Sequence, residues 1–104
     1  MSSEAEARLL LDYRPPFLAY LAHQDEAGLR AAYELGRQAV GRHVGLLGLV
    51  RIHNQVFLEV IDTVRTPDAA RETAQDASSF LFEALAPFEM THRAFPGRGA
   101  ARSR

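Results

Sequence analysis

Residues 46–64, with the sequence LLGLVRIHNQVFLEVIDTV, decide the fold of this chain. Each residue of an α-helix advances about 100°, so the apolar residues of this stretch cover roughly 240° of the helix surface. An ordinary surface helix has an apolar stripe of about 100° or somewhat more. We therefore expect a helix that is covered on more than one side, either as the central helix of a bundle or as part of a dimer interface. The residues expected in this core or dimer seam are Leu47, Val50, Phe57, Leu58 and Ile61.

The segment before this helix predicts an amphipathic helix over residues 26–42. Asp25 is a favourable N-cap, because its carboxylate can accept a hydrogen bond from a free N–H group of the first turn. Gly36 lies in the middle of the apolar arc, which indicates a close approach of another helix. The opposite face carries a polar line that is either the rim of a partner contact or a solvated face: Arg30, Glu34 and Arg37.

The segment after it begins with Thr66-Pro67-Asp68, which is a typical helix start. Threonine caps the free N–H groups, proline suits the first helical position, and an acidic residue in the first turn meets the helix dipole. We expect this helix to run to about Phe95 and to bend near Pro87, because proline cannot donate an N–H group to the preceding turn.

Two phenylalanines of this last helix are expected to differ in burial. Phe88 lies on the apolar arc and is expected in the core, whereas Phe82 falls on the opposite face among polar residues. Aromatic side chains are enriched in interface cores, so Phe82 is the best candidate for a contact with a partner protein. A single exposed apolar residue is also common on protein surfaces, and Met90 lies off the arc as well.

The chain as a whole is expected to be an all-α, four-helix bundle that forms a homodimer. Residues 4–24 supply the first helix. Since a mid-helix proline costs about 3 kcal/mol, the pair Pro15-Pro16 predicts that this helix either kinks strongly or restarts there, and we favour a short lead-in followed by a helix from about Pro16. No alternating run of β-branched residues suggests a strand. One domain over residues 1–95 is followed by a basic tail, residues 96–104, that has nothing to bury and is expected to be disordered.

Composition excludes several classes of protein. The chain has no cysteine, which rules out disulfides, a thiol nucleophile and cysteine-based metal sites. It has no apolar run near the ~20 residues that span a bilayer, so we expect a cytoplasmic protein without membrane contact. Its net charge is −1, and four of its twelve arginines lie in residues 93–104, so the body lacks the basic face that nucleic-acid binding requires.

His53 is the residue to which a chemical role is most easily assigned. It lies near the centre of the apolar arc of residues 46–64, which indicates a buried structural histidine. The alternative is a histidine phosphotransfer domain, also a four-helix bundle, but that role requires an exposed imidazole. The other histidines show no spacing of three or four that would place two metal ligands on one helical face. We expect no metal, no cofactor and no enzyme; a pocket between helices that senses a small ligand is a further alternative.

Three stretches resemble the N-terminal domain of RsbU-type stress-response serine phosphatases. They are residues 32–37 (AYELGR), residues 49–53 (LVRIH) and residues 80–93 (FLFEALAPFEMTHR), and the last six residues of the third stretch are the most specific. The order and separation of the three stretches also fit this family. The resemblance covers about residues 15–95.

The resemblance implies a function in signalling. Domains of this family are small helical bundles that dimerise and dock a switch protein of the serine-kinase type (RsbT-like), which activates an attached phosphatase of the PP2C class. It thus implies a partner-binding regulator in the partner-switching system that controls a general-stress sigma factor. No phosphatase domain follows in this sequence, and Pro96-Gly97 would end the last helix, so the chain is expected to be either an excised domain or a stand-alone relative.

Overall fold

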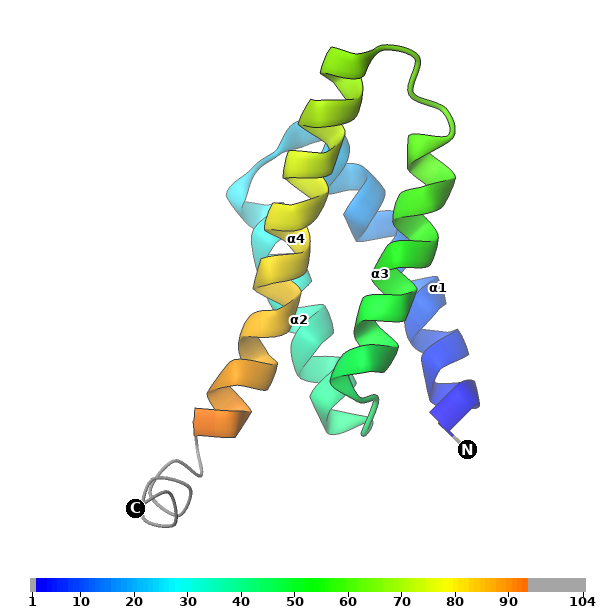
Figure 1. Ribbon diagram of the computed structural model, residues 1–104. Helices are drawn as coiled ribbons and strands as arrows, with labels where there is room; N and C mark the ends of the chain where they lie inside the picture. Colours follow the sequence, from blue (N-terminus) through cyan, green and yellow to red (C-terminus); the bar gives the residue numbers. More distant parts are fainter. Residues whose placement is uncertain (1, 94–104) are drawn as a thin grey trace, which may run out of the picture.

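The computed structural model describes the backbone of residues 2–93 and the side chains of residues 4–90. Within this range the chain forms four α-helices and no strand, which confirms the predicted all-α bundle. The helices are α1 (Ser2–His23), α2 (Glu26–Gly41), α3 (Leu46–Ile61) and α4 (Pro67–Arg93). Figure 1 shows α3 and α4 side by side at the front, with α1 and α2 behind them. The expected end of the last helix at Phe95 and the tail from Pro96 lie outside the described residues.

The prediction of a helix that restarts at Pro16 was wrong, because α1 runs without a break from Ser2 to His23. Pro15 and Pro16 have no N–H groups to donate to the carbonyl groups of Leu11 and Asp12, so this turn lacks two of its helical hydrogen bonds. Packing offsets that loss, since Tyr13 and Phe17 on either side of the prolines are both fully buried. Tertiary contacts therefore decide the course of this helix against its local preference.

The helix ends follow the predicted caps closely. The Asp25 side chain accepts a hydrogen bond from the Gly28 N–H group at 2.9 Å, and the Thr66 hydroxyl accepts one from the Ala69 N–H group at 3.1 Å.

α3 ends at Ile61, three residues before the predicted Val64, and α4 continues through Pro87 as expected. His43, just after α2, has a φ of 61°, a left-handed conformation that lets the chain turn sharply into α3.

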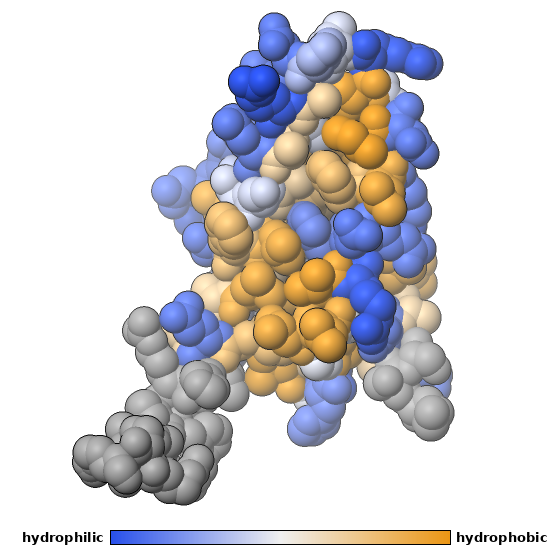
Figure 2. All heavy atoms as spheres, in the orientation of Figure 1, coloured by the Kyte–Doolittle hydropathy of each residue, from blue (hydrophilic) through white to orange (hydrophobic). Residues whose placement is uncertain are grey.

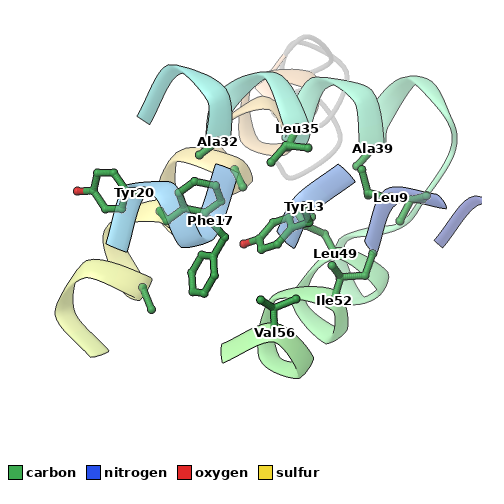
Figure 3. Close-up of a cluster of buried hydrophobic side chains, with 14 residues drawn as sticks. Leu9, Tyr13, Phe17, Tyr20, Ala32, Leu35, Ala39, Leu49, Ile52 and Val56 are labelled. Atoms are coloured by element: carbon green, nitrogen blue, oxygen red, sulfur yellow. The ribbon is translucent and has the colours of Figure 1, made fainter. Parts of the chain in front are cut away.

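The core is built around aromatic side chains of α1. Tyr13 and Phe17 meet the ring of Phe80 from α4 with centroid separations of 5.3 Å in both cases, and all three side chains are fully buried. Figure 3 shows how α2 and α3 close this cluster from two sides with small and branched side chains. The residues they contribute are Ala32, Leu35, Ala39, Leu49, Ile52 and Val56.

Of the two alternatives for α3, the central helix of the bundle is not what the structure shows. α3 packs on α1 and α4 through one strip, which holds Leu49, Ile52, His53 and Val56. The most extensive helix–helix contact in the described part of the chain is instead between α2 and α4. A single copy of the bundle therefore covers one side of α3 and leaves the other side to solvent.

Candidate functional site

The uncovered side of α3 carries several exposed and half-buried apolar side chains. Leu47 is 70% exposed and Leu58 is 51% exposed, and both lie on the side of the helix opposite the core. We call this side the α3 face; it comprises Leu46, Leu47, Val50, Phe57, Leu58 and Ile61, of which Val50, Phe57 and Ile61 are half-buried. All five residues expected in a core or dimer seam belong to the α3 face, and none of them is fully buried. Figure 2 shows apolar surface over α3 and α4 on this side of the molecule.

The α3 face continues onto α4 at one end. An open cavity of about 430 Å³ is lined by Leu46 from the start of α3 and by Leu85, Phe88 and Glu89 from α4. Phe88 was expected in the core, but its side chain is only half-buried and packs against the core from this edge. Truncating Phe88 should therefore destabilise the fold by less than the 3–5 kcal/mol typical of a fully buried phenylalanine.

Phe82 lies on the outward crest of α4 and is 67% exposed. On the helical wheel Phe82 is about 60° from Leu85, on the side of α3, and about 80° from Met90, on the side of α2. An aromatic side chain in this position is not needed to fill the core, since Phe80 and Ala84 already do so. Its exposure agrees with the out-of-phase position read from the sequence.

The polar line of α2 is exposed along its length. Arg37 lies 3.4 Å from the carboxylate of Glu34, one turn away, and Arg30 continues the line toward the start of the helix. Arg37 also lines a cavity of about 280 Å³ with Tyr33, Val40, Gly41, Pro87 and Met90. At this cavity α2 meets α4 through Pro87 and Met90 rather than through Phe82.

Two residues of this second cavity were not predicted as surface residues of interest. The hydroxyl group of Tyr33 donates a hydrogen bond to the sulfur of Met90 at 3.1 Å, and Met90 is 56% exposed. The only signal for Met90 in the sequence was its position off the arc of the last helix. Since the two residues are 57 positions apart, the pairing required the packing of α2 on α4.

Gly36 is the point at which α2 and α4 approach most tightly. A Cβ atom at this position would overlap the carbonyl oxygen of Ala84 and would lie 3.0 Å from the Cδ atom of Pro87. The close approach expected from the sequence is therefore observed, and its partner is α4. The absence of a side chain at Gly36 lets the backbones of the two helices touch.

His53 lies in the core, where its Nδ1 atom is 2.7 Å from the hydroxyl group of Tyr13. Its imidazole packs edge-on against Phe17 and parallel to Phe57, and the residue is 8% exposed. Burial lowers the pKa of His53 from 6.5 to about 4, so the ring is neutral near pH 7. A buried, neutral imidazole held by a tyrosine does not present the accessible nitrogen that phosphotransfer requires.

The faces of α1 are tied to the neighbouring helices by ion pairs. Arg14 pairs with Glu59 of α3 at 3.0 Å, and Asp12 pairs with Arg42 just after α2 at 3.3 Å. An open cavity of about 510 Å³ lies between α1 and α2 beside this second pair and is lined largely by polar side chains and prolines.

Among the described residues no group of three or more side chains could hold a metal ion, and no described helix is long and apolar enough to cross a membrane.

Comparison with known proteins places the chain in one family. Residues 11–91 match the family described as phosphoserine phosphatase RsbU, N-terminal domain. No match was found among curated proteins or among solved structures. The matched range contains α2, α3 and most of α4, together with the second half of α1. Because the match covers well over half of the chain, this protein belongs to the family of RsbU N-terminal domains, which are regulatory rather than catalytic.

Proposed function

We propose that the chain is a non-catalytic docking and dimerisation domain of a stress-response pathway that works by partner switching. In this role it binds a switch protein of the serine-kinase type, similar to RsbT, and through it controls a PP2C-type phosphatase and hence a sigma factor in the cytoplasm. The proposal includes no catalytic step and no cofactor. The observation that carries it is the group of exposed apolar side chains on α3 and α4, which include Leu46, Leu47, Leu58 and Phe82. Contiguous exposed apolar side chains are typical of surfaces that bind another protein.

The surface divides into two parts with different proposed partners. The α3 face is an apolar strip without a charged side chain, which is the composition typical of a permanent contact between two copies of one chain. Phe82 is instead a single exposed aromatic side chain of α4, the helix that packs on α2 with its exposed charged residues. An aromatic centre with a polar rim is typical of a smaller contact. We therefore assign the α3 face to a second copy, and Phe82, Arg30, Glu34 and Arg37 to the kinase-type partner.

Isothermal titration calorimetry with a purified RsbT-like switch protein tests the second assignment. Phe82→Ala should weaken binding by at least about tenfold, because an aromatic side chain at the centre of an interface contributes about 2 kcal/mol or more. Circular dichroism should show an unchanged helical fold, since Phe82 fills no space in the core.

Leu18→Ala is the matched control, because Leu18 of α1 is also exposed, at 43%, but lies on another helix. It should bind the switch protein as tightly as the unmodified chain does. Equal affinity of the Phe82→Ala variant and the unmodified chain would remove Phe82 from the proposed contact. Absence of binding by the unmodified chain would contradict the proposed partner itself.

A further inference from the structure

Met90 holds the only sulfur atom among the described residues. The chain has no cysteine and two methionines, of which Met90 lies in α4. Met90 is 56% exposed and lines the 280 Å³ cavity between α2 and α4 together with Tyr33, Arg37 and Pro87. An oxidant that reaches this surface therefore meets a thioether, which is the side chain most readily oxidised after cysteine.

The hydrogen bond from Tyr33 makes the two sides of this sulfur unequal. A thioether sulfur carries two lone pairs and is a weak acceptor. The Tyr33 hydroxyl, at 3.1 Å, occupies one of them. The hydrogen bond does not engage the second lone pair, and the residue as a whole is largely exposed. Because oxidation at one lone pair or the other gives opposite configurations at sulfur, a fixed donor on one side should direct oxidation to the other side.

We propose that Met90 is a site of reversible oxidation to methionine sulfoxide by a peroxide, and that Tyr33 selects which sulfoxide epimer forms. In the reaction a sulfur lone pair attacks one peroxide oxygen, the S–O bond forms and the O–O bond breaks. Sulfur loses two electrons, and with hydrogen peroxide the second oxygen leaves as water after taking up a proton. Methionine sulfoxide reductases return the thioether, with one class of enzyme for each epimer.

Oxidation changes the chemistry of the surface between α2 and α4. It replaces an apolar, flexible side chain with a polar one, whose oxygen is a stronger acceptor for nearby donors such as the guanidinium group of Arg37. Arg37 belongs to the rim assigned above to the kinase-type partner. The effect of oxidation on partner binding thus rests on the proposed function, whereas the reaction at Met90 does not.

The first experiment treats the intact, folded chain with hydrogen peroxide and measures the Met90 sulfoxide by peptide mass spectrometry. Portions of the product are then reduced with MsrA or with MsrB, which act on opposite epimers. In the unmodified chain we expect one epimer to exceed the other by about threefold or more. In Tyr33→Phe, which lacks only the hydroxyl group, the two epimers should form in nearly equal amounts.

Two controls identify the cause of the preference for one sulfoxide epimer. Tyr20→Phe removes a tyrosine hydroxyl from α1 and should keep the epimer ratio of the unmodified chain. Oxidation of the chain unfolded in urea should give nearly equal epimers. Equal epimers in the folded, unmodified chain, or an unchanged ratio in Tyr33→Phe, would overturn the role of Tyr33. A Met90 oxidation rate more than about tenfold below that of the urea-unfolded chain would overturn the site itself.

The second experiment repeats the calorimetric titration with the RsbT-like switch protein after peroxide treatment. The oxidised chain should bind at least about fivefold more weakly, and reduction with the matching reductase should restore the affinity. Met90→Leu keeps an apolar side chain of similar size and should lose no affinity on treatment. Equal binding before and after oxidation would overturn the effect on docking. If the untreated chain does not bind the switch protein at all, the proposed function fails, while the epimer assay still decides the proposal for Met90.

Discussion

Burial lowers the pKa of His53 to about 4, because the rings of Tyr13, Phe17 and Phe57 replace the water that would hydrate a charged imidazole. In the unfolded chain the same group titrates near 6.5. The folded state therefore binds this proton less tightly than the unfolded state does. Its stabilising contribution is complete above pH 6.5 and is lost as the pH falls from 6.5 toward 4.

This difference predicts an acid-sensitive core. Between pH 7 and pH 4 the free energy of unfolding should fall by about 3 kcal/mol from this residue alone. Urea unfolding at several pH values measures it. His53→Gln, a neutral side chain that can still form a hydrogen bond with Tyr13, corrects for the titration of the carboxylates. The pH dependence of the unmodified chain should exceed that of the variant by this amount; identical dependences would contradict the prediction.

Single residues were predicted well where the helical wheel alone decides exposure. The exposure of Phe82 and the burial of His53 follow from their phase on the helix, and both are observed. The burial of Phe88 was overestimated, because its position on the apolar arc says nothing of how far the neighbouring helix extends beside it. The hydrogen bond between Tyr33 and Met90 depends on the register between α2 and α4, which one chain segment does not reveal.

Among the helices, α2 and α4 pack so closely at Gly36 that no side chain fits between their backbones. Gly36 allows the backbone of α2 to touch Ala84 and Pro87 of α4. Adding a methyl group there would force the two helices apart, since the Ala84 carbonyl belongs to the backbone and cannot move aside as a side chain can.

We predict that Gly36→Ala destabilises the domain by about 1–3 kcal/mol or more, the usual cost of overpacking, although alanine favours helix in isolation. The control is Gly41→Ala at the end of the same helix, where a Cβ atom meets nothing within 4 Å. That variant should be neutral or slightly stabilising. Thermal unfolding followed by circular dichroism compares the two, and a Gly36→Ala variant as stable as Gly41→Ala would rule out the close contact.

Helix positions were predictable to the extent that caps and prolines mark them. Asp25 and Thr66 fixed the beginnings of α2 and α4, because each caps its helix within the first turn. Pro15-Pro16 misled the prediction for α1, since the burial of Tyr13 and Phe17 outweighs the lost hydrogen bonds. The sequence left two roles open for α3, because a wide apolar face indicates that a helix needs to be covered but does not reveal whether its own chain or a second copy covers it.

At the scale of the whole molecule, the α3 face predicts self-association. Leu47 and Leu58 lie eleven residues apart, about three turns, on the same side of α3. Substituting Leu47→Glu would place a charge in the proposed interface, where it would lose its hydration without a partner.

Sedimentation velocity at micromolar concentration should show a dimer for the unmodified chain and a shift toward the 11.5 kDa monomer for Leu47→Glu. Leu11→Glu is the control, because Leu11 is similarly exposed, at 66%, but lies on α1. It should sediment as the unmodified chain does. A monomeric unmodified chain would contradict the assignment of the α3 face to a second copy.

The burial of Leu9 has a practical consequence for anyone who trims this protein. The family match begins at residue 11, yet Leu9 is fully enclosed and Glu6 reaches Arg51 of α3 at 3.5 Å. A fragment cut to residues 11–91 would open a hole beneath Leu49 and Val44 and should lose about 2–5 kcal/mol, the range measured for deleted core leucines. Its melting temperature against that of a fragment spanning residues 2–91 tests this. The first turns of α1 thus supply part of the core, although they precede the range that the family match covers.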